Sequence, residues 1–150
     1  QAIIEDLDVN VYYSAVATSF PAFSNAFGSK INNVLGAGGT NVDDPQIAEY
    51  REAHLKITGK VADYWASANT YAALQILEQA IVGAATLDRE VVTQYIKDNT
   101  FDTVMGDLNF KNNFSNTFWS VGQWQDGVFR GVKGSNVNGA VDVRLKDGWK

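Results

Sequence analysis

The side chains most able to do chemistry in this sequence are one histidine and seventeen carboxylates, and there is no cysteine. His54 lies between Ala53 and Leu55 in a segment with helical spacing, where a lone histidine is more often structural than catalytic. The lack of cysteine excludes thiolate zinc sites, disulfides and cysteine nucleophiles. No G-x-S-x-G, H-E-x-x-H or EF-hand pattern occurs. We therefore expect no catalytic centre, no metal site and no cofactor.

Two pairs of neighbouring aromatic residues are better candidates for a binding function. Tyr12 and Tyr13 precede a loop of small residues that runs from Ser14 to Thr18, and Tyr64 with Trp65 precedes a long helical pattern. Aromatic side chains beside small residues at the ends of elements suit the wall of a ligand pocket. The alternative is that all four aromatic side chains belong to the core, and the spacing alone favours that alternative.

The charge pattern excludes several classes of partner. The formal net charge is −5 and the charges are dispersed, so no basic surface for nucleic acid or an anionic membrane is expected. The glycine-rich run Gly36–Gly39 departs from both the dinucleotide fingerprint and the phosphate-binding loop. No apolar run approaches the roughly 18 residues of a membrane-spanning helix.

The elements that would position the aromatic pairs alternate between strand and helix. Strand patterns cover residues 11–13, which we expect to be buried, and residues 33–37, 104–110, 118–124 and 128–132. Helical patterns run from Ser19, as the N-cap, to Gly28, from Asp44 to Gly59, from Ser67 to Val82, and from Asp88 to about Asn99. Asp126-Gly127 indicates a hairpin turn. The order predicts an α/β protein with a parallel sheet.

Two finer expectations concern the helices. Apolar residues recur along the long helix at a spacing of three or four, which predicts a stripe that packs into the core. This stripe comprises Tyr71, Leu74, Leu77 and Ile81. Leu87 precedes the Asp88 cap and is expected to contact Val92 as a hydrophobic staple.

Several segments carry a resemblance to a known family. Residues 70–81 read TYAALQILEQAI, residues 87–92 read LDREVV, residues 101–106 read FDTVMG and residues 122–127 read GQWQDG. In this order and spacing they resemble the branched-chain amino-acid and amide family of periplasmic solute-binding proteins, which serve ABC importers. The resemblance covers roughly residues 11–132.

The resemblance implies a type I periplasmic-binding fold, in which two lobes of parallel sheet flanked by helices enclose a cleft. This chain would be the C-terminal portion of that fold. Residues 1–60 would belong to the second lobe, 61–100 would return as helices to the first, and 101–150 would supply the last strands of the second lobe and the tail. The opening Gln1-Ala2-Ile3-Ile4, without an initiator methionine, fits an interior start. We expect the missing first lobe, or self-association, to cover the apolar faces left open.

The function implied by the resemblance is binding rather than catalysis. The chain would be part of the substrate-binding component of an ABC importer, located in the periplasm or lipid-anchored in a Gram-positive cell. It would deliver a small amino-acid-like, amide or aromatic solute to a membrane permease. A ligand-sensing domain of a regulator or receptor is the alternative with the same fold. A small α/β hydrolase or transferase is a third reading, and it lacks a nucleophile motif.

The resemblance also implies the residues of the site. One group is the loop after the first strand, and the other is the start of the long helix. The expected ligand-binding residues are Ser14, Ala15, Val16, Ala17, Tyr64, Trp65 and Ala66. Amino-acid binders of the family place an acid in the first loop to pair with the ligand's ammonium group, and this loop has none. Because an unpaired buried ammonium is costly, the departure weakens the case for a plain α-amino acid.

Overall fold

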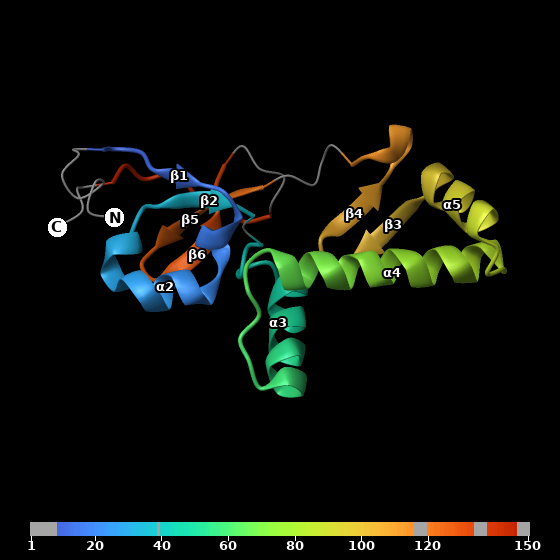
Figure 1. The fold of residues 1–150 in the computed structure, drawn as a ribbon, viewed down its shortest axis with the longest axis horizontal. Helices are drawn as coiled ribbons and strands as arrows, with labels where there is room; N and C mark the ends of the chain where they lie inside the picture. Colours follow the sequence, from blue (N-terminus) through green and yellow to red (C-terminus); the bar gives the residue numbers. More distant parts are fainter. Residues whose placement is uncertain (1–8, 39, 116–119, 134–137, 147–150) are drawn as a thin grey trace.

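The computed structural model describes residues 9–38, 40–115, 120–133 and 138–146. Two groups of elements lie next to each other along the long axis of the molecule (Figure 1). A four-stranded sheet with helix α2 forms one group. Helices α4 and α5 form the other with the hairpin β3–β4, and α3 projects from the region between the two groups.

The four-stranded sheet has the order β1-β2-β5-β6 and is mixed. Strands β1 (Tyr13–Ser14) and β2 (Leu35–Ala37) are parallel. Strand β5 (Val121–Gln125) pairs antiparallel with β2 and with β6 (Val128–Gly131). The α/β class is thus confirmed, and among the four strands of this sheet the expected parallel arrangement is confined to the pair β1 and β2.

Local turn chemistry explains the two hairpins. Asp126 and Gly127 have φ values of 55° and 81°, the left-handed pair that a tight two-residue turn requires, which confirms the predicted hairpin. The strand predicted over residues 104–110 is confirmed in a shorter form, β4 (Gly106–Asn109). Its partner β3 (Thr100–Thr103) was not predicted, and the two strands form an antiparallel hairpin.

The described residues form four α-helices. They are α2 (Pro21–Phe27), α3 (Pro45–Thr58), α4 (Ala66–Ala84) and α5 (Arg89–Asp98). Three short 3-10 segments connect elements: η1 (Val16–Ser19), η2 (Gly28–Ile31) and η3 (Lys111–Asn113).

The helix boundaries follow the caps visible in the sequence. The Asp44 carboxylate accepts from the Gln46 N–H at 3.0 Å, and Asp88 accepts from two N–H groups of α5. Gly59 ends α3 with φ 69°. Ser19 does not cap α2, because its hydroxyl donates back to the Val16 carbonyl and Phe20 stands at the cap position. Leu87 is 81% exposed, so the predicted staple onto Val92 is wrong.

The buried residues form clusters, two of which match the two groups, while a third joins Ile47 of α3 to α4 and Val104. Beside the four-stranded sheet, Ile31, Val34, Tyr64, Trp124 and Phe129 form one cluster. Around α4, a second cluster joins helix residues to the β3–β4 hairpin, and it comprises Ile76, Ala80, Val92, Phe101 and Leu108. The hairpin therefore packs with the helices and not with the four-stranded sheet.

The long helix buries a different face from the one predicted. Tyr71, Leu74 and Leu77 are 46%, 59% and 45% exposed, so the expectation that they pack into the core is wrong. Ile81, the fourth residue of the predicted stripe, is partly buried and packs against the second cluster. The buried face carries mostly alanine, at positions 68, 72 and 80, with Ile76. Small side chains let β3 and α5 approach the helix closely, and this contact decides which face is buried.

The first strand also differs from its prediction. Pairing begins at Tyr13, and both Val11 and Tyr13 are more than half exposed, so a buried strand over residues 11–13 is wrong. The reason is its position, since β1 lies at the edge of the described sheet.

Two glutamines fasten the C-terminal segment to the sheet. The Gln123 side chain is fully buried, donates to the carbonyls of Asn33 and Arg144, and accepts from the Arg144 N–H. Gln125 donates to the Asp142 carbonyl. The Lys146 ammonium donates to the carbonyls of Lys30 and Asn32 at 2.9 and 2.8 Å. Residues 142–146 thus satisfy polar groups that the sheet buries.

Candidate functional site

The parallel strands β1 and β2 end at the same edge of the sheet. β1 ends at Ser14 and leads into η1, while β2 ends at Ala37 and leads into Gly38. Ligands of open α/β sheets bind outside the carboxyl ends of the strands. This edge is therefore the expected position of a ligand site.

The predicted loop Ser14–Ala17 lies at this edge. Ala15, Val16 and Ala17 are exposed and Ser14 is partly buried. A hydrogen bond across the loop holds its conformation, because the hydroxyl of buried Thr18 donates to the Ser14 carbonyl at 3.0 Å. A Cβ at Gly36 would lie 1.9 Å from the Thr18 hydroxyl oxygen, so the close approach of the loop to β2 requires glycine there.

Backbone hydrogen bonds bring the second predicted segment to the same edge. The Tyr64 N–H donates to the Ser19 carbonyl at 3.1 Å, and the Thr40 N–H donates to the Tyr64 carbonyl at 3.1 Å. The segment before α4 is thereby joined to the segments that follow β1 and β2. The structure thus brings together two regions that lie about fifty residues apart in the sequence.

The two aromatic residues of this segment have different positions. Tyr64 is buried, with its ring centroid 5.5 Å from that of Trp124 and 5.7 Å from that of Phe129. The Arg51 guanidinium lies 4.5 Å from the Tyr64 ring centroid. Tyr64 is thus a core residue that anchors the segment. Trp65 is half-buried, and its indole lies against Gly38, where a Cβ would come within 2.7 Å of it.

Asp63 holds the start of α4, and sequence reasoning missed it. Its carboxylate accepts hydrogen bonds from the Trp65 N–H at 2.7 Å and from the Ala66 and Ser67 N–H groups. An anion at this position also complements the partial positive charge of the helix N-terminus. The available signal was an aspartate shortly before the helical pattern, two residues ahead of Trp65, which stands at the N-cap position.

We expect Asp63→Ala to lower the free energy of unfolding by about 0.5–2 kcal/mol, because it leaves these N–H groups at the start of α4 without their acceptor. Urea denaturation followed by circular dichroism measures this change. Asp63→Asn keeps an acceptor oxygen and should recover most of the loss. Equal losses in the two variants would contradict the capping role.

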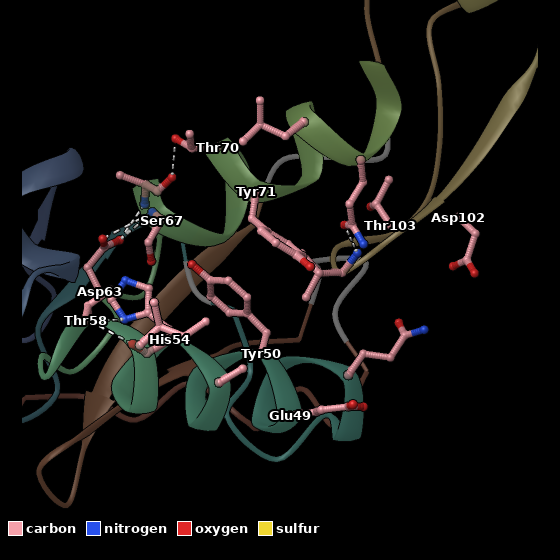
Figure 2. Close-up of a pocket in the computed structure, with 17 residues that line it drawn as sticks. Glu49, Tyr50, His54, Thr58, Asp63, Ser67, Thr70, Tyr71, Asp102 and Thr103 are labelled. Carbon is pink, nitrogen blue, oxygen red and sulfur yellow. Dashed lines mark hydrogen bonds between the residues drawn. The ribbon is translucent and has the colours of Figure 1, made fainter. Parts of the chain in front are cut away.

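A separate cavity of about 800 Å³ lies between α3, the start of α4 and β3 (Figure 2). Tyr50 and His54 line it from α3, and Tyr71 lines it from α4. Ala66 is the one predicted site residue among the residues that line it. Sequence reasoning missed this cavity, because nothing local indicates that Tyr50 and Tyr71, on different helices, face each other.

His54 has a structural position in this cavity wall. Its Nδ1 lies 3.0 Å from the Lys60 carbonyl oxygen, which can only accept, so Nδ1 carries the hydrogen. The Thr58 hydroxyl donates to the His54 carbonyl at 2.8 Å. These bonds tie the end of α3 to the segment after it.

Within the residues that the structure describes, no group of three or more histidine, cysteine or acidic side chains is arranged to hold a metal ion. Over the same ranges, no helix combines the length and the apolar character needed to cross a membrane.

No protein-family model matches the sequence, and no curated protein matches it. Solved structures do match. A leucine-binding protein from Thermotoga maritima aligns with a TM-score of 0.62 and 19% identity over 79% of this chain and 35% of its own. A leucine-, isoleucine-, valine-, threonine- and alanine-binding protein from Brucella ovis gives 0.65 and 15% over 82% and 36%.

An extracellular ligand-binding receptor from Rhodopseudomonas palustris aligns with a TM-score of 0.59 and 16% identity over 80% of this chain and 39% of its own. The chain therefore spans between 35% and 39% of the length of these three structures. At such identities the likeness concerns the fold. The chain has the type I periplasmic-binding fold that the sequence resemblance predicts, and it spans a portion of it.

Proposed function

We propose that this chain is part of the extracytoplasmic solute-binding component of an ABC importer, and that it binds its solute without transforming it. The observation that carries the proposal is the Tyr64–Ser19 backbone hydrogen bond, which joins the two expected binding segments at the carboxyl edge of β1 and β2. The solved structures with the same fold are named as solute-binding proteins and receptors, which supports the same role.

The proposed site has one wall in this chain. Ser14 to Ala17 and the pair Trp65 and Ala66 would contact the solute, with Tyr64 anchoring the second segment from the core. Further polypeptide, corresponding to the rest of the two-lobed fold, would supply the opposite wall. Closure of the two walls around the solute would create the surface that a membrane permease recognises. The corresponding location is the periplasm, or the outer surface of a cell in which the protein is lipid-anchored.

The lobe boundaries at residues 60 and 100 also remain proposals. The β3–β4 hairpin packs against α4 and α5, which favours moving residues 100–109 to the group of helices. The last strands, β5 and β6, pair with the β1–β2 group. On this division the chain passes from one lobe to the other just before α4 and returns between β4 and β5.

The charges at the site favour an amide or an apolar or aromatic solute. The loop from Ser14 to Thr18 contains no carboxylate. Asp63, the acid closest in sequence to Trp65, already accepts hydrogen bonds from the Trp65 N–H and from the first two N–H groups of α4. A free α-ammonium group would therefore lack a dedicated partner at this wall, and burying it would be costly.

We expect Trp65→Ala to weaken solute binding by the complete gene product at least about fivefold, because it removes an aromatic wall worth more than about 1 kcal/mol. Isothermal titration calorimetry with leucine, leucinamide and phenylacetamide would measure this, with the neutral phenylacetamide binding more tightly than leucine. Phe114→Ala removes an exposed ring outside the site and serves as the control. Unchanged affinity of Trp65→Ala for every solute that binds would refute this site.

A sensing role is the second candidate. It is favoured by one observation, that the similar structure from Rhodopseudomonas palustris is named as a receptor and not as a transporter component. A DNA-binding, kinase or membrane-spanning region in the same gene would decide for sensing. Permease genes beside it would decide for transport.

A further inference from the structure

A turn at residues 138 and 139 contains the only asparagine in the sequence that glycine follows directly. Asn138 and Gly139 are both exposed. Gly139 has a φ of 70°, in the left-handed region, and a Cβ there would lie 2.5 Å from the side-chain nitrogen of Asn41. The backbone angle and this close contact both select glycine. The peptide nitrogen next to the Asn138 side chain therefore belongs to the residue type that shields it least.

Two groups of this turn can react with each other, and both are free within the described residues. Neither the Gly139 N–H nor the Asn138 side-chain amide forms a hydrogen bond there. The Asn138 carbonyl, in contrast, accepts from the side-chain N–H of buried Asn41 at 2.5 Å. When the Gly139 nitrogen loses its proton, the negative charge is shared with this carbonyl oxygen, and a donor placed on the oxygen stabilises it. The turn thus presents an activated nucleophile beside an unrestrained amide.

We propose that Asn138 is a site of spontaneous conversion to isoaspartate. The deprotonated Gly139 nitrogen attacks the side-chain carbonyl carbon of Asn138, the bond from that carbon to the amide nitrogen breaks, and ammonia leaves with a proton taken from water. Water then opens the five-membered succinimide at either carbonyl, which gives aspartate or, with the backbone routed through the side-chain carbon, isoaspartate. One water is consumed and one ammonia is released, and nothing is oxidised or reduced. The proposal is independent of the solute-binding role.

Conversion changes the contact between this turn and the loop after β2. The isoaspartate backbone is longer by one methylene group, and the former backbone carbonyl becomes a carboxylate. Holding that charge against buried Asn41 is costly, so the turn moves away and the Asn41 amide loses its acceptor. Asn41 also holds the start of α3, because its backbone carbonyl accepts from the Asp44 N–H at 3.1 Å and its side-chain oxygen from the Asp43 N–H at 3.4 Å. Residues 40–44 are therefore expected to loosen as Asn138 converts.

Incubation of the complete gene product at mildly alkaline pH, followed by trypsin digestion and mass spectrometry, tests the conversion. Asn138 lies in the tryptic peptide 134–144, and a sample taken at zero time corrects for conversion during digestion. Asn113 is the internal control, since it is also exposed and has a φ of 67°, but Phe114 follows it. Asn138 should convert at least about tenfold faster than Asn113, because the Phe114 side chain crowds the attacking nitrogen.

Two variants test the structural consequence. Asn138→Gln keeps the backbone of the turn but would need a larger ring, so it should not convert. Asn138→Asp supplies the negative charge without lengthening the backbone. Amide hydrogen exchange over residues 40–44 should be faster in the aged parent protein than in fresh Asn138→Asp or in aged Asn138→Gln. The proposal is overturned if Asn138 keeps its amide as long as Asn113 does, or if the aged parent protein exchanges no faster than Asn138→Asp.

Discussion

Replacing Trp124 with alanine will remove much of the stability of the chain. The Trp124 side chain is 1% exposed and packs against Tyr64 and Phe129, and its indole N–H donates to the Thr18 carbonyl at 2.7 Å. Truncating a buried tryptophan costs about 3–5 kcal/mol, and the total stability of a domain is about 5–15 kcal/mol. Urea denaturation followed by circular dichroism will show a large fall in the midpoint.

Phe114→Ala is the matched control for Trp124→Ala. Phe114 is 59% exposed, so its truncation should change the free energy of unfolding by less than about 0.5 kcal/mol. The Trp124 ring also connects the sheet to the candidate site through Tyr64 and Thr18, so the variant should lose solute binding together with stability. A loss of stability below about 1 kcal/mol for Trp124→Ala would show that this core is wrongly placed.

A second large effect separates two neighbouring residues of α4. Ile76 is 7% exposed and packs against α5 and β3, whereas Leu77, about 100° further around the helix, is 45% exposed. We expect Ile76→Ala to cost about 2–5 kcal/mol and Leu77→Ala to cost less than about 1 kcal/mol. The stripe read from the sequence predicts a large loss at Leu77, so thermal or urea unfolding of this pair tests the structure directly.

Protein concentration is the control for the Ile76 and Leu77 pair. If a second copy covers the open face of α4, the loss at Leu77 will grow as the concentration rises, while the loss at Ile76 will not. A loss above about 2 kcal/mol for Leu77→Ala at low concentration would contradict the exposure seen here. In the proposed two-lobed protein, the same face is the natural place for the remaining polypeptide to pack.

The sequence predicted well those features that depend on a few adjacent residues. Asp44, Asp88 and Gly59 mark helix ends through their own hydrogen bonds or dihedral angles, and Asp126-Gly127 fixes a hairpin in the same way. These signals are local, so the structure they specify does not depend on contacts with distant parts of the chain.

Features that depend on contacts across the chain were harder to predict. Helix α4 carries apolar residues on more than one face, so periodicity alone could not decide between the alanine-rich face and the face with Leu74 and Leu77. The approach of β3 and α5 decides it. β3 itself was missed, because its residues, Thr100–Thr103, carry little hydrophobic pattern and its partner β4 lies beyond a turn.

The candidate site shows the same division. The segments around Ser14 and Trp65 were expected from the family resemblance, but their meeting depends on the Ser19–Tyr64 hydrogen bond, which no local pattern indicates. Sequence could not distinguish Tyr64, which is buried, from the adjacent Trp65, which is partly open. The cavity between Tyr50 and Tyr71 requires two helices to be positioned before it exists.

The glutamine-fastened C-terminal segment has a consequence for how this chain is made. Chains are synthesised from the N-terminus at about 5–20 residues per second, and their early parts begin to fold first. β1 and β2 are made long before β5 and β6, and the buried amides of Gln123 and Gln125 each find one of their two acceptors in residues 142–144. Lys146 then supplies the donor for the carbonyls of Lys30 and Asn32. The sheet beside the candidate site is thus completed only after nearly all of these 150 residues have left the ribosome.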